Sequence, residues 1–135
     1  MRKSGVLLHI TSLPSPGGIG TLGQAAYDFV DFVHSAGMNI WQVLPVGPTG
    51  YAESPYQSTS TYAGNPLMID IPFLERDGIL PEGTYHPLPN AGQIDFEAVK
   101  AQHAELLGAA YAHARERMAD EIDAFAGSHP WARDY

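Results

Sequence analysis

The chain has 135 residues, no cysteine and a formal net charge of −8, with Lys+Arg 7 against Asp+Glu 15. This composition argues against a disulfide framework, thiol chemistry, nucleic-acid binding and attraction to anionic membranes, and the length suits one domain with its own core. No apolar run approaches the roughly 20 residues of a membrane span. The apolar part of the opening MRKSGVLLHI is too short for a signal peptide, so we expect a cytoplasmic protein.

The first half of the chain predicts a strand–helix–strand unit. Apolar runs at Gly5–Ile10 and Asn39–Leu44 are typical of strands that are buried on both faces of a parallel sheet. Between them, Leu22–Ala36 carries apolar residues at helical spacing. Units of this kind have parallel strands and a right-handed crossover, so the expected fold class is α/β.

Both ends of this helix carry capping signals. Thr21, with Gln24 three residues later, predicts a capping box at the N-terminus. Gly37 is placed to adopt a left-handed conformation just past the C-terminus.

The stretch Trp41–Pro66 is the most informative part of the sequence. Loops at the carboxyl ends of parallel strands carry the chemistry in such folds, and here those loops are Thr11–Gly20 and Pro45–Pro66. Prolines restrict the second loop, so we expect it to be ordered, and Glu53 is its only formal charge. A neutral surface of aromatic rings and hydroxyls suits a sugar, and the alternative is a structural loop that packs its tyrosines inward. These tyrosines are Tyr51, Tyr56 and Tyr62.

The chain after Pro66 is predicted to be mostly helical. Leu67–Ile71 is a third apolar segment and resembles a strand. Pro72–Asp77 predicts one or two helical turns that end at Gly78. Leu80–Gly92 holds three prolines and is predicted to be irregular.

A long helix is predicted to begin after Asp95, because aspartate caps helix N-termini well. The segment Ala124–Tyr135 is ambiguous: Pro130 suggests a break, while Trp131 and Tyr135 are spaced as on one face of another helix. The apolar stripe of the long helix consists of Phe96, Val99, His103, Leu106, Leu107, Ala110, Ala114 and Met118.

The run Gly18–Gly23 matches the G-x-G-x-x-G fingerprint of dinucleotide-binding units. The fingerprint should follow its strand directly, however, and an acidic residue should end the second strand. The second strand instead ends in Leu44-Pro45-Val46. Dinucleotide binding therefore stays a minor alternative.

The residues do not predict a complete catalytic set. The six histidines show no metal-ligand spacing, and His9 is interpreted as a hydrogen-bonded core residue rather than one that faces the active end of the sheet. Cleavage of a glycosidic bond normally needs two carboxyl groups flanking that bond. Glu53 is the only acid in the strand-end loops. The residues alone thus indicate a strand–helix–strand unit with a loop suited to sugars.

Four motifs in fixed order point to a known family. TSLP, GPTGY, SPYQ and AGNP lie within SGVLLHITSLPSPGGIGTLGQAAYDFVDF and AGMNIWQVLPVGPTGYAESPYQSTSTYAGNPLMI. These runs closely resemble the N-terminal part of the 4-α-glucanotransferases (amylomaltases or disproportionating enzymes) of glycoside hydrolase family 77. The resemblance is strong over Ser4–Gly78 and weaker from there to the W-x-x-x-Y at the end.

The resemblance implies a (β/α)8 TIM barrel of the α-amylase superfamily, of which residues 1–135 would form the N-terminal part. Residues 1–66 would supply the first βαβ unit and a glucan-facing loop, and residues 67–135 a mostly helical continuation, with the rest of the barrel absent. The family transfers α-1,4-glucan segments between maltooligosaccharides or starch chains with retention. Its catalytic carboxylates lie on later strands, so we expect the 135-residue chain alone to be inactive.

On matching positions, the resemblance implies that Tyr56 of SPYQ stacks near the reacting sugar, with Ser54 and Gln57 in the same segment. It also implies that Tyr51 of GPTGY belongs to a secondary glucan contact. No metal or organic cofactor is expected; the expected partners are an α-1,4-glucan and the remainder of the barrel. A stand-alone, non-catalytic glucan-binding module is the other alternative, although an exposed apolar sheet edge would favour its aggregation.

Overall fold

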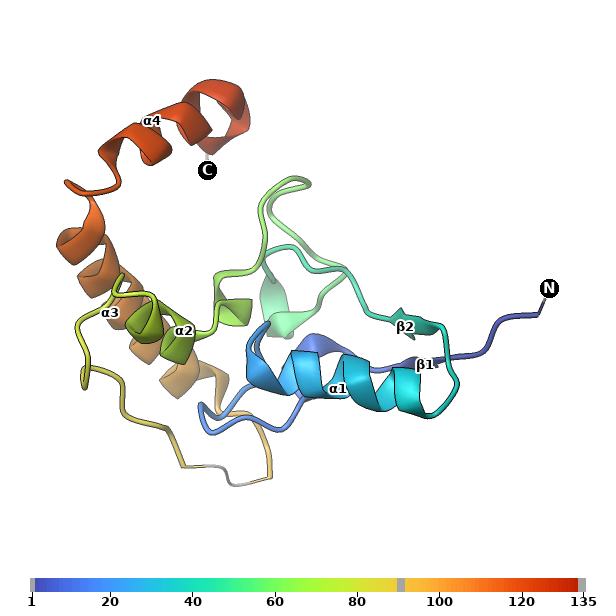
Figure 1. The fold of residues 1–135 in the computed structure, drawn as a ribbon. Coiled ribbons are helices and arrows are strands. Elements are labelled where there is room, and N and C mark those ends of the chain that lie inside the picture. Colours follow the sequence, from blue (N-terminus) through green and yellow to red (C-terminus); the bar gives the residue numbers. More distant parts are fainter. Residues whose placement is uncertain (1, 90–91, 134–135) are drawn as a thin grey trace.

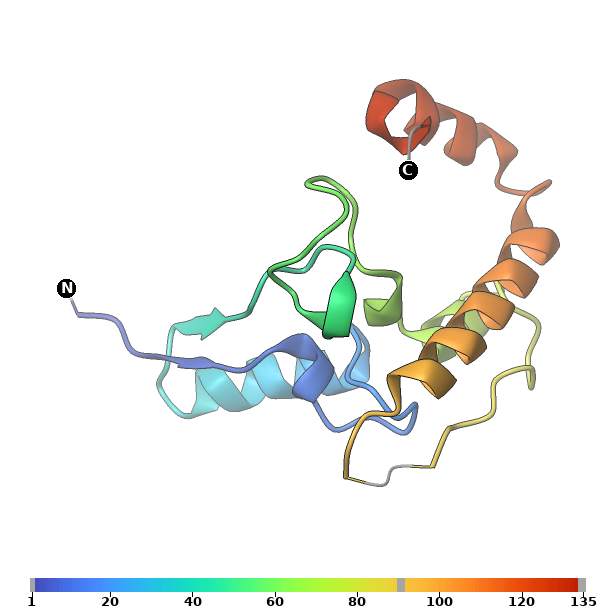
Figure 2. The ribbon, with the colours of Figure 1, turned by 180° about the vertical axis from the view of Figure 1, so that it is seen from behind.

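The computed structural model describes residues 2–89 and 92–133. The sheet and helix α1 lie at one end, helices α2, α3 and α4 lie at the other, and the loop after β2 runs between them (Figure 1 and Figure 2). No helix in the described ranges is long and apolar enough to cross a membrane. The elements are β1 (Gly5–Leu7), the 3₁₀ turn η1 (Ile10–Ser12), α1 (Gln24–Ser35), β2 (Ile40–Gln42), η2 (Tyr51–Glu53), η3 (Pro66–Met68), α2 (Ile71–Arg76), α3 (Phe96–Ala114), α4 (Ala119–Ser128) and η4 (Pro130–Arg133).

The predicted strand–helix–strand unit is confirmed. β1 pairs with β2 in parallel, with Val6 opposite Trp41. Helix α1 packs on one face of this pair, where the Phe29 ring lies edge-on to Trp41 with ring centroids 4.9 Å apart. The Trp41 indole donates a hydrogen bond of 2.7 Å to the Leu8 carbonyl. Trp41 therefore ties the two strands and the helix together.

The strands are shorter and more exposed than predicted. Each has three residues, and the side chains of Leu7 and Ile40 are 58% and 43% exposed. The expectation of burial on both faces is wrong for this structure. Helix α1 covers the face that carries Trp41, and the described residues supply no comparable cover to the face that carries Leu7 and Ile40.

The start of α1 also differs from the prediction. The helix begins after Gly23, which has no side chain to cap it. The expected capping box is wrong, because the Thr21 hydroxyl donates to Asp70 Oδ2 at 2.6 Å and the Gln24 amide donates to a carboxylate one turn further on. The end of the helix agrees with the prediction, since Gly37 has a φ of 74°.

The third apolar segment, Leu67–Ile71, is not a strand, because two short helical elements begin there. Asn65 caps η3 and Asp70 caps α2, each through a side-chain oxygen that accepts a backbone N–H at 3.0 Å. Pro66 and Pro72 lie in the first turns of these elements, where a missing N–H is tolerated, whereas in a sheet each would remove a ladder bond. Helix α2 agrees with the short helix that the sequence predicts there.

Helix α3 begins as predicted. Asp95 accepts a hydrogen bond of 3.1 Å from the backbone N–H of Ala98. The helix ends at Ala114, so Met118, which the predicted stripe included, lies beyond it and precedes α4. The buried part of the stripe consists of Val99, His103, Leu106, Ala110 and Ala114.

The remaining predictions for the second half are partly confirmed. The described part of Leu80–Gly92 contains no helix or strand, as expected. Helix α4 runs through Gly127, so the predicted break falls just before Pro130. Tyr135 lies outside the described residues, and the helix predicted through it is not tested.

Three apolar clusters form the core of the described residues. The first packs α1 against the strand ends through Ile10, Leu13, Ala26 and Met68. The second packs α2 on α3 through Ile71, Leu80, Leu106 and Ala110. The third joins α3 to the loop after β1 and to η3 through Ile19, Leu67 and Val99. Helix α3 is therefore part of the support for both loops at the strand ends.

Two glycines before α1 allow a close approach between segments. A Cβ atom on Gly20 would lie 2.0 Å from the Ile10 carbonyl oxygen, and a Cβ atom on Gly23 would lie 1.9 Å from Asp70 Oδ2. Neither distance is possible for real atoms, so both positions require glycine as long as the neighbouring segments stay in place.

Gly23→Ala should destabilise the chain by about 2 kcal/mol or more, because the new methyl group displaces the Asp70 carboxylate from Thr21 and from the start of α2. Gly108→Ala is the control, because Gly108 is exposed on α3 with no atom within 4 Å of the new methyl group, and should stabilise the chain by about 0.5–1 kcal/mol. Urea unfolding measures both. Equal midpoints for Gly23→Ala and the wild type would contradict this account.

Candidate functional site: the loop after β2

The loop of residues 45–66 is held by its own hydrogen bonds. The Asn65 backbone N–H donates to the Val46 carbonyl at 2.8 Å and closes the base of the loop. Near the tip, the Ser60 hydroxyl accepts from the backbone N–H groups of Tyr62 at 3.3 Å and Ala63 at 3.1 Å. The loop is thus ordered by specific bonds, as its proline content predicts.

The tyrosines of this loop point outward. Tyr51 is 87% exposed, and Tyr56 and Tyr62 are each 73% exposed. Within the described residues, the three rings therefore do not pack inward as the alternative interpretation expects. Tyr62 also stacks on Trp131 of η4, with ring centroids 6.3 Å apart, so the C-terminal segment contacts the tip of the loop.

A cavity of about 460 Å³ lies within the loop, and we call it the loop cavity. Its lining combines aromatic rings, hydroxyl groups and prolines, and it includes no charged side chain. Neutral polar ligands with apolar faces, such as sugars, match such a lining. The lining includes Pro45, Pro55, Tyr56, Ser58, Ser60, Thr61 and Tyr62.

The structure separates the four residues that the sequence singled out. Tyr56 lines the loop cavity. Ser54 is half-buried at the end of η2, and its carbonyl accepts the Gln57 backbone N–H at 3.1 Å. Gln57 is exposed, and Tyr51 lies on η2, outside the lining of the loop cavity. Tyr56 therefore has the strongest structural support of the four.

Glu53 is held in an ion pair that the sequence did not reveal. Its carboxylate accepts hydrogen bonds from Lys100 of α3 and, at 2.6 Å, from the Thr49 hydroxyl. Burial alone would raise the pKa of the Glu53 carboxyl, but these two hydrogen bonds and the charge of Lys100 together lower that pKa below its usual range. At neutral pH Glu53 is therefore a paired carboxylate, not a proton donor. The partners are 47 residues apart, and no local pattern predicts such a contact.

A second cavity, of about 500 Å³, lies between the loop and α3. It is lined by Thr49, Thr59, Asn65, Lys100 and His103 together with apolar side chains. His103 is only 3% exposed and its Nδ1 lies 3.1 Å from the Val99 carbonyl. Burial lowers the pKa of His103, so the ring is neutral at pH 7. His103 thus belongs to the buried stripe of α3, as the sequence predicts.

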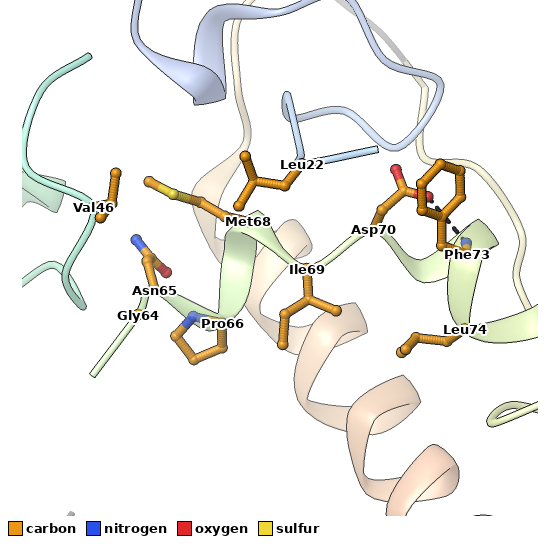
Figure 3. A pocket seen from close by; sticks show the side chains of 10 residues that line it. All are labelled: Leu22, Val46, Gly64, Asn65, Pro66, Met68, Ile69, Asp70, Phe73 and Leu74. Atoms are coloured by element: carbon orange, nitrogen blue, oxygen red, sulfur yellow. Dashed lines mark hydrogen bonds between the residues drawn. The ribbon is translucent and has the colours of Figure 1, made fainter. Parts of the chain in front are cut away.

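A third cavity, of about 560 Å³, is apolar and open, and Figure 3 shows its lining. Leu22, Ile69 and Leu74 are among the side chains around it, and Asp70 lies at its edge with its hydrogen bond to the Phe73 backbone. The apolar character of this lining suits packing against other protein segments better than binding of a sugar.

The surroundings of His9, just after β1, differ from those that the sequence predicts. The residue is half-buried, and its buried Nδ1 has no hydrogen-bond partner among the described residues. The expectation of a hydrogen-bonded core histidine is therefore wrong for this nitrogen. Burial lowers the pKa of His9, which favours the neutral ring. Within the described residues, no three His, Cys, Asp or Glu side chains are grouped as metal ligands.

Comparison with known proteins settles the family. The family model described as 4-alpha-glucanotransferase matches residues 8–135. The chain belongs to this family. Among its relatives, the 4-alpha-glucanotransferases of Thermus thermophilus and Aquifex aeolicus are 43% and 41% identical over 99% and 100% of the chain. The chain spans 27% and 28% of the length of these two relatives.

A solved structure supports the same assignment. The amylomaltase of Streptococcus agalactiae, solved in complex with acarbose, matches with a TM-score of 0.90 and 34% identity. The match covers 97% of this chain and 28% of the amylomaltase. The resemblance to 4-α-glucanotransferases that the sequence motifs indicate is confirmed, and the α/β arrangement described above occurs within that amylomaltase.

Membership of this family leaves the glycines of Gly18–Gly23 without a role in dinucleotide binding, and their surroundings explain two of them. The Asp70 carboxylate lies against Gly23, the residue that precedes α1. A dinucleotide unit would place its pyrophosphate at the start of this helix, where the carboxylate would repel it. Gly20 is required by its contact with the Ile10 carbonyl. The start of α1 therefore does not fit a dinucleotide.

Proposed function

We propose that this chain forms part of the glucan-binding surface of a 4-α-glucanotransferase, an enzyme that transfers α-1,4-glucan segments between maltooligosaccharides or starch chains with retention. The observation that carries the proposal is the loop cavity, which a chain of this family lines with Tyr56, Tyr62 and hydroxyl groups. The acarbose complex of the Streptococcus agalactiae amylomaltase supports a sugar-like ligand for such a surface.

Within this proposal, residues 1–135 are the N-terminal part of a (β/α)8 barrel. Residues 1–66 provide the first βαβ unit and the glucan-facing loop, and residues 67–135 provide a mostly helical continuation. The exposed strand face with Leu7 and Ile40 and the apolar cavity of Figure 3 support this assignment, because further barrel elements would bury both. The remainder of the barrel is thus the proposed protein partner of this chain.

The proposal gives each site residue a role. Tyr56 stacks on a sugar ring, Ser54 and Gln57 offer polar groups beside it, and Tyr51 makes a separate glucan contact. The exposure of both tyrosine rings supports these roles, because an exposed aromatic face is available to the C–H face of a sugar. No metal or organic cofactor takes part in the proposal. The proposed location is the cytoplasm, although two plant relatives carry chloroplastic/amyloplastic in their names.

In the complete enzyme that this proposal implies, Tyr56→Ala should weaken glucan transfer through loss of stacking, by about 1–3 kcal/mol in kcat/KM for maltooligosaccharides. Tyr111→Ala is a matched control, because Tyr111 is 59% exposed but lies on α3, away from the loop cavity. Steady-state kinetics with maltotriose measures both variants. The assignment of Tyr56 fails if its variant keeps the wild-type kcat/KM.

The 135-residue chain alone should have no glucanotransferase activity. Retaining transfer needs a carboxylate nucleophile and a carboxylic acid about 5–5.5 Å apart. Glu53 is the only acid in the two strand-end loops, and it is paired with Lys100 rather than with a second carboxyl group. Incubation with maltotriose, followed by analysis for glucose and longer oligosaccharides, tests this. Redistribution above a heat-killed control that is lost in Glu53→Gln would show that the catalytic centre lies here.

A further inference from the structure

The turn at residues 51–53 has an unusual backbone. Ala52 and Glu53 are consecutive and have φ values of 54° and 55°, in the left-handed region that non-glycine residues seldom adopt. They are the only non-glycine residues with positive φ among the described residues. Such a conformation persists only where surrounding interactions impose it.

The backbone of the turn makes only weak hydrogen bonds of its own. The Glu53 backbone nitrogen lies 3.3 Å from the Gly50 carbonyl oxygen, and the Ser54 backbone nitrogen lies 3.4 Å from the Tyr51 carbonyl oxygen, both longer than the usual range. The stronger interactions come from the Glu53 side chain, which accepts from Thr49 at 2.6 Å and pairs with Lys100. The side chain, more than the backbone, therefore holds the turn.

The two members of the ion pair differ in their surroundings. The Glu53 side chain is 15% exposed and the Lys100 side chain 43% exposed. Hydrogen bonding to Glu53 raises the pKa of Lys100, and the pair holds the pKa of Glu53 below its usual range although burial acts in the opposite direction. Glu97, one turn earlier on α3, also interacts with Lys100, but the hydrogen bond goes to Glu53. Removing the Lys100 side chain would leave the largely buried Glu53 carboxylate with the Thr49 hydroxyl as its only side-chain hydrogen-bond donor.

Lys100 extends from a firmly packed part of α3. Val99, its neighbour in the chain, is 1% exposed and packs on Ile19 and Leu67, and His103 one turn later is 3% exposed.

The segment around Glu53, the other member of the ion pair, contains the candidate sugar-binding residues. Tyr51 begins the turn, and Gly50 contacts the Gln57 carbonyl so closely that a Cβ atom would lie 2.5 Å from it. A shift of the turn would therefore move the segment that contains Tyr56.

We propose that Lys100 is a positioning residue, which fixes the conformation of the segment 50–57 through its ion pair with Glu53 and thereby presents Tyr51 and Tyr56 to the glucan. The inference rests on the proposed function, and it adds a residue of α3 to the determinants of glucan affinity. Lys100 acts through Glu53 and takes no part in bond cleavage. Loss of Lys100 therefore lowers the fraction of molecules in which the segment 50–57 has the conformation that binds the glucan.

The test uses the complete enzyme with Lys100→Met, Lys100→Arg and Glu53→Gln. Asp77→Asn is the matched control, because it removes the pairing charge of the Arg76–Asp77 ion pair, whose side chains are 60% and 49% exposed. Two quantities are measured for each variant: amide hydrogen exchange of residues 50–57, and KM and kcat with maltoheptaose. Amide exchange measures how often the segment opens, whereas KM and kcat measure whether that opening affects glucan binding and turnover.

Lys100→Met and Glu53→Gln should each raise the exchange rate of the segment and KM by about tenfold with kcat within about twofold, because affinity falls with the fraction of competent loops. Lys100→Arg, which keeps the charge, should restore both values to within about threefold, and Asp77→Asn should change neither. Unchanged exchange and KM in Lys100→Met would overturn the inference, as would the same losses in Asp77→Asn. If the wild type does not act on or bind maltoheptaose, the proposed function fails, and the exchange rates alone still decide whether Lys100 fixes the segment.

Discussion

The carboxylate of Asp70 is the contact on which the two halves of this structure depend. One oxygen accepts the Thr21 hydroxyl before α1, and the other accepts the Phe73 backbone N–H at the start of α2. The same carboxylate fills the space beside Gly23 that any side chain would need. A single acid thus caps α2 and holds the segment before α1 close to the start of α2. The hydrogen bond of 2.9 Å from the Leu22 N–H to the Met68 carbonyl reinforces the same junction.

The loop after β2 depends in turn on the helical half of the chain. Glu53 reaches Lys100 on α3, Tyr62 stacks on Trp131 of η4, and the base of the loop ends at Asn65, which caps η3. The residues that offer a surface to a sugar and the residues that hold this surface in place are therefore far apart in sequence. This division explains why a loop with outward-facing tyrosines can be ordered although half of its residues are exposed.

Sequence reasoning succeeded where the determinants are local. The apolar runs of β1 and β2, the left-handed Gly37 and the Asp95 cap are each readable within a few residues, and all are present. Prediction failed where a distant partner competes. Thr21 bonds to Asp70 49 residues away rather than capping α1. Prediction also failed at the strand-like Leu67–Ile71, although the determinant there is local, because the apolar run was given more weight than the Asp70 cap of the helix that begins at Ile71.

The same distinction applies to the candidate site. The outward tyrosines lie in a segment whose composition already suggested a sugar, whereas Lys100 appeared only as an ordinary charged residue of a predicted helix. The exposed strand face was predicted to be buried, because an apolar run indicates that a strand is covered but does not say which segment covers it. The family motifs supplied the proposed roles of Tyr51 and Tyr56, which composition alone left open.

The most direct test of this account is a crystal structure of the protein with bound acarbose. The account predicts a sugar ring in van der Waals contact with the exposed face of Tyr56, with the Glu53–Lys100 ion pair and the left-handed turn at residues 52–53 intact. Acarbose bound without any contact to the loop of residues 45–66 would contradict it.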